Sequence, residues 1–150
     1  VKATKEAVAA IEQADVIIFG IGSIYTSICP NVIIPEIRKA LQKNQGLKVY
    51  VANAMSQPGE TEGYGLEDHV QAIEQHAQVK MDVVIYASDI IPTKVLARYV
   101  DREAFPVQIK AKEHDYKLIK KKLLKFDTER VRHDPNRIRD VLEELFRKVR

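Results

Sequence analysis

Three short runs of β-branched and aromatic residues most constrain the fold of this chain. Runs that are apolar at nearly every position are typical of strands buried on both faces, as in parallel sheets covered by helices. Parallel neighbours also need long crossovers, and the intervening segments are long enough to supply them. The sequence therefore predicts an α/β, Rossmann-like, three-layer fold with a mainly parallel sheet. The three runs are DVIIFG (15–20), LKVYVAN (47–53) and MDVVIYAS (81–88).

The segments between and after these runs have the periodicity of helices. Pro30 and Pro35 can each open a helical turn, Gly46 is expected to end the second helix, and Asp134 is expected to cap the last one. Two short extended pieces are expected at 105–110 and 122–126. The helices are expected at 3–13, 35–46, 66–77, 92–100 and 134–149.

Length and composition fit one domain over residues 1–150. The chain is 45% hydrophobic and 30% charged, and no apolar run approaches the length of a membrane helix, so we expect no membrane partner. Cys29 is the only cysteine and no signal-type segment is present, so we expect a cytoplasmic protein. Because the chain starts at Val1 and enters a helix at once, we expect a piece of a longer protein.

Positive charge is concentrated in the last third. Residues 1–93 hold seven basic and eleven acidic side chains, a net charge of −4, whereas residues 94–150 hold seventeen and ten, a net charge of +7. Such a segment can bind nucleic acid or an acidic partner. Its charges alternate with leucine and isoleucine, however, and no aromatic stacking platform accompanies them, so we expect a solvated face and no nucleic-acid partner.

The loop after the first run, GIGSIYTSICPN (20–31), can bind an anion. Gly20 and Gly22 let backbone N–H groups approach a phosphate, and a helix that starts behind them adds partial positive charge. The alternative is a plain turn in which Ser27 caps the helix. A third glycine and an acidic residue after the second run are missing, which argues against a dinucleotide fingerprint, and no Gly-Lys-Ser/Thr forms a P-loop.

A second polar loop follows the second run. NAMSQPGETEGYG (53–65) offers five hydrogen-bonding side chains within nine residues, which suits recognition of a ribose, base or sugar; the alternative is a solvated loop. Ligands of such sheets bind beyond the carboxyl ends of the strands, so we expect both loops to face one crevice. The five side chains are Asn53, Ser56, Gln57, Glu60 and Thr61.

No residue carries a strong catalytic or metal-binding signal. His69 and His76 lie two helical turns apart, about 10 Å, which is too far to share a metal ion. Asp68 and His69 are expected to cap and pack a helix, and Cys29 is expected to behave as a small buried hydrophobe.

Taken together, these motifs resemble the YvcK/CofD family, specifically its gluconeogenesis-factor branch. The family reads GPGSLYTS and N-x-MTQPGETxGY where this chain has GIGSIYTS (20–27) and NAMSQPGETEGY (53–64). Ile21 replaces the usual proline and Ser56 the usual threonine. Family members also have an N-terminal strand and a GGGTG-like nucleotide loop, so the resemblance implies the C-terminal portion of a larger CofD-like domain.

The resemblance implies a non-enzymatic regulator that binds UDP-sugars such as UDP-N-acetylglucosamine and is needed for cell morphogenesis and growth on gluconeogenic carbon sources. The alternative is a CofD-like 2-phospho-L-lactate transferase acting on a guanosine diphosphate-linked donor with a divalent ion such as Mg²⁺. A homo-oligomer is left open, because half a doubly wound sheet exposes apolar surface. The expected ligand-binding residues are Gly20, Gly22, Ser23, Thr26, Ser27, Asn31, Asn53, Gln57, Gly59, Glu60 and Thr61; no catalytic or metal residue is expected.

Overall fold

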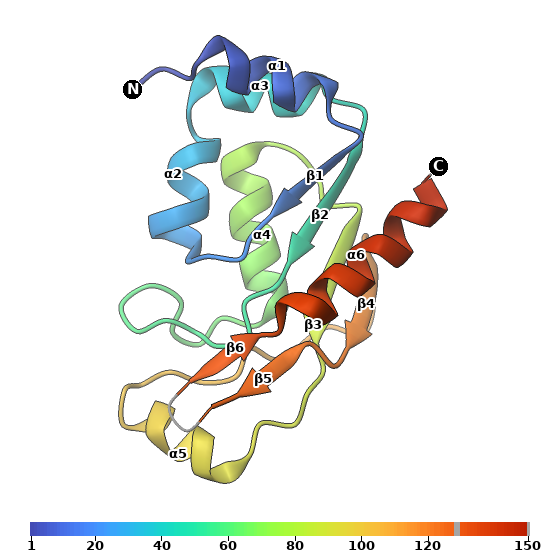
Figure 1. Cartoon of the computed structure of the whole chain (residues 1–150). Coiled ribbons are helices and arrows are strands. Elements are labelled where there is room, and N and C mark those ends of the chain that lie inside the picture. The colour runs from blue at the N-terminus through green and yellow to red at the C-terminus, as the bar shows by residue number, and fades with distance from the viewer. Residues whose placement is uncertain (128–129, 150) are drawn as a thin grey trace.

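A four-stranded parallel sheet forms the centre of the computed structural model, which describes residues 1–127 and 130–149. The strands follow chain order (Figure 1), with Val16 beside Leu47 and Val49 beside Val83. A separate antiparallel pair, β5 and β6, follows the sheet. The α/β fold predicted from the sequence is therefore confirmed. The strands are β1 (Val16–Phe19), β2 (Leu47–Val51), β3 (Val83–Ala87), β4 (Lys117–Lys121), β5 (Leu124–Phe126) and β6 (Val131–His133).

The helices lie close to where the sequence places them. Pro30 lies in the first turn of α2 and Pro35 opens α3. Asp134 caps α6, because its Oδ1 accepts the Asn136 N–H over 2.9 Å. The helices are α1 (Lys5–Gln13), the π-helical segment η1 (Ile24–Ile28), α2 (Cys29–Val32), α3 (Pro35–Lys43), α4 (Leu66–Ala77), α5 (Thr93–Val100) and α6 (Pro135–Val149). None of the described helices is both long and apolar enough to cross a membrane.

Two local predictions are wrong. Helix α3 ends at Lys43 with Asn44 as its C-cap, so Gly46 does not end the helix. Gly46 is needed for close packing instead, since a Cβ there would lie 2.4 Å from the carbonyl oxygen of Ala14. Residues 105–110 form no strand; an isolated bridge between Met55 and Pro106 is the sheet-like pairing there.

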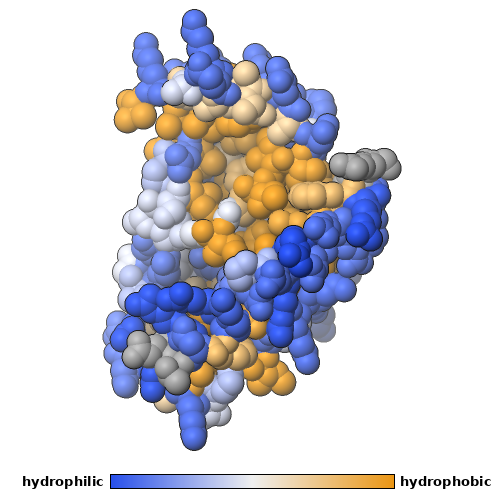
Figure 2. Space-filling view, in the orientation of Figure 1, coloured by the Kyte–Doolittle hydropathy of each residue, from blue (hydrophilic) through white to orange (hydrophobic). Residues whose placement is uncertain are grey.

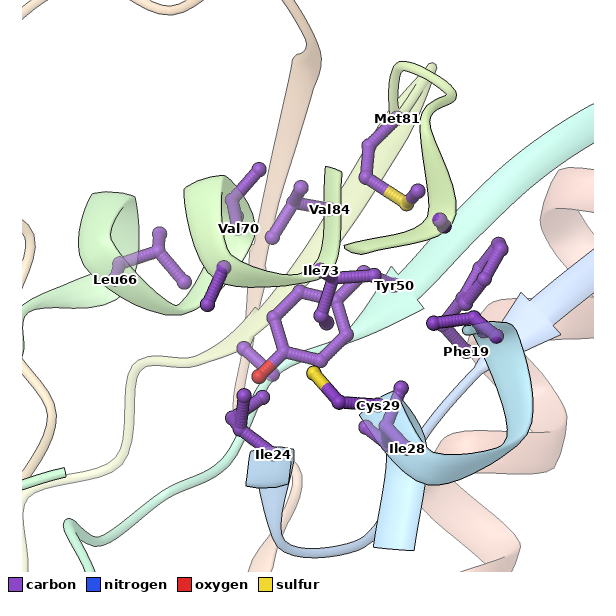
Figure 3. Packing of buried hydrophobic residues seen from close by; sticks show 14 of the residues in the cluster. Phe19, Ile24, Ile28, Cys29, Tyr50, Leu66, Val70, Ile73, Met81 and Val84 are labelled. Carbon is purple, nitrogen blue, oxygen red and sulfur yellow. The ribbon is translucent and has the colours of Figure 1, made fainter. Parts of the chain in front are cut away.

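One face of the sheet is covered by η1 and helices α2 to α4. Tyr50 of β2 is fully buried at the centre of this cluster, between Ile73 of α4 and Cys29 of α2 (Figure 3). The predicted apolar face of α4 is buried as expected, and Cys29 is a free, buried thiol. This packing fixes the helix that follows the first loop against the sheet.

Helix α6 covers the opposite face. Val141 and Leu145 of α6 pack on Val49, Val51 and Ile85 of the two central strands. Alternation along β2 explains the division, because Val49 and Val51 point to α6 whereas Tyr50 points to the other layer. The chain therefore builds the three layers expected of the fold.

Candidate functional site

The first loop begins with a glycine that no other residue can replace without strain. Gly20 has a φ of +103°, and a Cβ at this position would lie 2.7 Å from the carbonyl oxygen of Val51. The glycine thus lets the end of β1 pass close to the end of β2. The turn is set by this close approach.

Three hydroxyl groups gather behind the turn. Ser23 Oγ is hydrogen-bonded to Thr26 Oγ1 and lies 3.1 Å from Ser27 Oγ. Ser23 is the N-cap of η1, whose first N–H groups have no partner within the helix. Ser27 does not cap α2, so the alternative of a simple Ser27 cap has no support. Asn31 bonds locally, donating from Nδ2 to the Ser27 carbonyl over 2.7 Å.

Asn53 brings the second loop to the first. Its Nδ2 donates to the carbonyl of Gly22 over 2.9 Å, and its Oδ1 accepts the Tyr50 hydroxyl over 2.7 Å. Tyr50 is fully buried, so the amide is oriented by the core itself. The structure therefore joins the two polar loops at the carboxyl ends of β1 and β2, as expected from the topology.

A pair of tyrosines makes a second link between the loops. The hydroxyls of Tyr25, from η1, and Tyr64, from the second loop, lie 2.7 Å apart. Their rings contact histidines of α4 edge-on, Tyr25 with His76 and Tyr64 with His69. The hydrogen bond to Tyr64, followed by burial, raises the pKa of Tyr25 to about 12. The link therefore ties the second loop to η1, which also carries Thr26 and Ser27.

The second loop is folded around Thr61 and presents two acceptors without partners. Thr61 is 1% exposed, and its Oγ1 accepts the Gln57 N–H over 2.8 Å, so its hydroxyl shapes the loop. Gln57 Oε1 and Glu60 Oε2 are buried without a hydrogen-bond partner. Burial raises the pKa of the Cys29 thiol, and the negative charge of Glu60 adds to this effect. Gly59 lies at the loop tip with a φ of +77° and open space around it.

Other polar residues of this region have structural roles. Ser56 is buried, and its Oγ accepts the Phe105 N–H over 2.9 Å, which ties the loop to the segment after α5. Asp68 Oδ2 accepts the Gly65 N–H over 2.7 Å at the start of α4, and His69 packs in the core with its Nδ1 on the Gly65 carbonyl. The capping and packing roles expected for Asp68 and His69 are confirmed.

The sequence did not predict that the chain comes back to the glycine turn after β5. His133 at the end of β6 lines a groove of about 500 Å³ together with Ile21 of the glycine turn. Burial lowers the pKa of His133, against an opposing hydrogen bond with the backbone of Ala52. A lone histidine inside a basic run carries no signal of this placement. The tyrosine link was also missed, because 39 residues separate its members.

Comparison with known proteins agrees with this architecture. The family model of 2-phospho-L-lactate transferase CofD matches residues 1–124. A gluconeogenesis factor of Halalkalibacterium halodurans is 41% identical over 120 residues, 79% of this chain and 36% of that protein. The gluconeogenesis factor of Bacillus subtilis is 34% identical over 146 residues, 95% of this chain and 46% of that protein.

A solved structure from the same family has the same fold. The crystal structure of a Bacillus halodurans protein superposes with a TM-score of 0.88 at 34% identity, covering 95% of this chain and 47% of that one. The chain thus spans less than half the length of each of these three relatives. Since the family model covers most of the chain and the relatives share its fold, the chain belongs to the CofD family, in the branch of the gluconeogenesis factors.

Proposed function

We propose that this chain is part of a nucleotide-sugar-binding regulatory protein of the gluconeogenesis-factor type. The observation that carries the proposal is the bond between Asn53 and Gly22, which joins the loop that bears the hydroxyl cluster to the loop that bears the unpartnered acceptors. Donors on one side and acceptors on the other match a ligand that has an anionic part and a hydroxyl-rich part.

The two parts of the ligand are assigned by charge. The diphosphate lies against the glycine turn, where Ser23, Thr26 and Ser27 donate together with the first N–H groups of η1. The sugar or base lies toward Gln57 and Glu60, because a carboxylate repels phosphate and accepts from hydroxyl or amide groups. Gly59 at the loop tip leaves room for this approach.

The physiological role that we propose is based on the name of the relatives. Their name, gluconeogenesis factor, supports a role for the whole protein in growth on gluconeogenic carbon sources, and we extend the proposal to cell morphogenesis and to UDP-sugars such as UDP-N-acetylglucosamine. The single buried cysteine fits a cytoplasmic location. Binding without chemistry is sufficient for such a regulator.

Calorimetric titration with UDP-N-acetylglucosamine, UDP and GDP tests the proposal. The double substitution Ser23→Ala and Thr26→Ala is expected to weaken binding of the uridine compounds by about tenfold or more, because two donors to a charged group are lost. Ser88→Ala, an exposed serine after β3, is the matched control. The same changes in the Bacillus subtilis relative, at the matching motif, report on a ligand that needs the longer protein.

The outcomes of these titrations distinguish the two candidate functions. Unchanged affinity in both proteins after the double substitution would overturn the assignment of the glycine turn. Binding of the uridine compounds alone supports the nucleotide-sugar proposal. Tight binding of GDP alone would replace it with the transferase alternative described next.

The family match favours one second candidate, a 2-phospho-L-lactate transferase acting on a guanosine diphosphate-linked donor. Such a reaction calls for a divalent ion such as Mg²⁺ near the diphosphate. Within the described parts of the chain, no group of three or more His, Cys, Asp or Glu side chains could hold a metal ion, and Glu60 is the carboxylate of the second loop with an unpartnered buried oxygen. The ion would therefore take further ligands from outside these residues.

A further inference from the structure

Strand β4 lies at an edge of the sheet and turns part of its backbone outward. It pairs with β3 on one side, and no strand in the described parts of the chain pairs with its other side. The Lys117 N–H donates, and the Lys121 carbonyl accepts, a hydrogen bond of 2.9 Å on the β3 side. Because this direction alternates along a strand, Leu118 and Lys120 point their N–H and carbonyl groups away from β3. These groups are free to continue the sheet.

The segment that contains this edge is strongly basic. KLIKKKLLKF (117–126) holds five lysines and no acidic residue, and all five lysines are exposed; Glu113 and Asp115 precede it. Lys121 lies 4.0 Å from Glu144 of α6, and the other four lysines form no ion pair with any residue that the structure describes. Figure 2 shows that hydrophilic side chains cover the part of the molecule where α6 and β4 lie. The four lysines without an ion pair are Lys117, Lys120, Lys122 and Lys125.

The lysines of β4 lie on both faces of the strand, beside half-buried apolar side chains. Leu118 packs against the core under α4, and Ile119 packs against the core under α6. Because side chains alternate along a strand, Lys120 lies on the face of Leu118, whereas Lys117 and Lys121 flank Ile119 on the other face. Each face of the edge therefore presents an apolar contact next to an amine.

The positive charge continues past the end of β4 on a backbone that is held in place. Leu123 and Leu124 are buried between the exposed Lys122 and Lys125. Asp89 Oδ2 accepts the N–H groups of both leucines, over 2.7 and 3.2 Å. The lysines are thus presented by an anchored, extended segment and not by a loose tail.

We propose that residues 117–125, which we call the β4 edge, bind an extended acidic segment of a partner protein, which joins the sheet as a further strand. The outward backbone groups of Leu118 and Lys120 pair with this strand, as in other proteins that bind peptides at a sheet edge. Its carboxylates lie against the lysines, and its apolar side chains lie against Leu118 and Ile119. Lysines keep neutral and basic strands away from a free edge, but they favour an acidic strand, because opposite charges across a strand pair attract.

Two other occupants fit the β4 edge less well. A second copy of β4, paired edge to edge about a two-fold axis, would place lysines against lysines, and like charges across a strand pair are unfavourable. A nucleic acid cannot continue the hydrogen-bond ladder of a sheet, and residues 117–126 offer no exposed aromatic side chain on which a base could stack. The polar loops of the candidate site follow β1 and β2, so the proposal stands or falls independently of the proposed function.

Fluorescence anisotropy with a labelled peptide, Glu-Val-Glu-Thr-Glu-Val-Glu, tests the proposal. The double substitution Lys120→Glu and Lys122→Glu is expected to weaken binding by about tenfold or more, because two attractions become repulsions. Lys2→Glu with Lys5→Glu is the matched control, since it changes the net charge equally but lies at the start of the chain, where both lysines are exposed. The control is expected to bind like the wild type.

A milder variant covers the case in which the charge reversal lowers the melting temperature. Lys120→Gln with Lys122→Gln removes the two charges without reversing them. It is expected to weaken binding less than the reversal does, and its melting temperature should equal that of the wild type. Wild-type affinity in this folded variant would overturn the proposal.

Two measurements distinguish strand pairing from the attraction of charges alone. A peptide with the same side chains but methylated backbone nitrogens is expected to bind about tenfold or more weakly, because it keeps its carboxylates and loses its backbone donors. With saturating unmodified peptide, the amides of Leu118 and Lys120 are expected to exchange with deuterium about tenfold or more slowly. The Lys117 amide is already bonded on the β3 side and should change less.

Four results would overturn the proposal. The first is no binding of the peptide, and the second is equal binding of the methylated peptide. The third is a single-stranded oligothymidylate that binds more tightly and displaces the peptide, which would assign the β4 edge to nucleic acid. The fourth is a dimer in sedimentation velocity that Lys120→Glu with Lys122→Glu alters and the control does not, which would assign the edge to a second copy.

Discussion

Asn53 joins the two loops of the candidate site by donating from Nδ2 to the carbonyl oxygen of Gly22 over 2.9 Å. The same amide accepts the hydroxyl of Tyr50, which is fully buried in the core. The geometry of the site is thus connected directly to the packing of β2. Any ligand that bridges the loops benefits from this prior order, because binding then costs less conformational entropy.

Asn53→Ala is expected to lower the free energy of unfolding by about 1–3 kcal/mol, because the buried Tyr50 hydroxyl and the Gly22 carbonyl lose their partner. Urea unfolding measures the change. Asn31→Ala is the control, since Asn31 is exposed and bonds only to a neighbouring turn, and it should cost clearly less. If both substitutions cost the same, the link between the loops has no special energetic role.

Gly20→Ala is expected to destabilise the chain by more than about 1–2 kcal/mol, because it adds a close contact with the Val51 carbonyl to the strain of a positive φ. Gly59→Ala separates the two effects. It also has a positive φ but meets nothing within 4 Å, so only the conformational cost remains. Thermal unfolding measures the loss of stability in both variants. An equal loss would show that the chain relieves the close contact with the Val51 carbonyl without losing stability.

Tyr64→Phe is expected to return the pKa of Tyr25 from about 12 toward its ordinary value of 10.0, because the hydrogen bond that Tyr25 donates to the Tyr64 hydroxyl is the largest cause of the shift. The folded state binds the Tyr25 proton more tightly than the unfolded state. This stabilisation is therefore complete below pH 10 and is lost as the pH rises toward 12. Ultraviolet titration of the phenol groups, with the Tyr25→Phe variant to assign the signal, measures the shift.

Glu67→Gln is expected to weaken the attachment of residues 110–114 to α4. Partial burial raises the pKa of Glu67, but hydrogen bonds from His114 and from the N–H groups of Ala111 and Lys110 outweigh it and lower the pKa to about 2. The ionised form is thus stabilised by folding. Its contribution is present above the ordinary value of 4.5 and is lost as the pH falls from 4.5 toward 2.

Urea unfolding at pH 7 and pH 3 checks this dependence on Glu67. The wild-type chain should lose more stability between the two pH values than Glu67→Gln does. Glu113→Gln, which removes an exposed carboxylate from the same segment, should behave like the wild type. A Glu67→Gln variant with the full wild-type loss would assign the acid sensitivity to other groups.

The strands were predicted where their sequence reports burial and were missed where it does not. β1, β2 and β3 are continuous apolar runs, and each was placed correctly. β4 was missed because Lys117, Lys120 and Lys121 hide its pattern, as suits an edge strand. β6 was missed because three residues with one arginine and one histidine have no readable period.

The sequence predicted that the candidate site consists of two loops, but the roles of the individual side chains in these loops were visible only in the structure. Both loops lie at the carboxyl ends of neighbouring parallel strands, as the topology requires. The sequence cannot distinguish Thr61, whose hydroxyl is bonded within the loop, from Gln57 and Glu60, whose buried oxygens have no partner. That difference depends on where each side chain points after the loop has folded.

The sequence by itself determined the α/β class, the helices with their proline starts, the position of the glycine turn and the polar loops, because these depend on local conformation and periodicity. Tertiary structure alone decided that Tyr25 meets Tyr64, that Asn53 reaches Gly22, and that β1 lies at an uncovered edge. Such relationships join residues distant along the chain, and they arise only when the order of the strands and the packing of the helices are fixed.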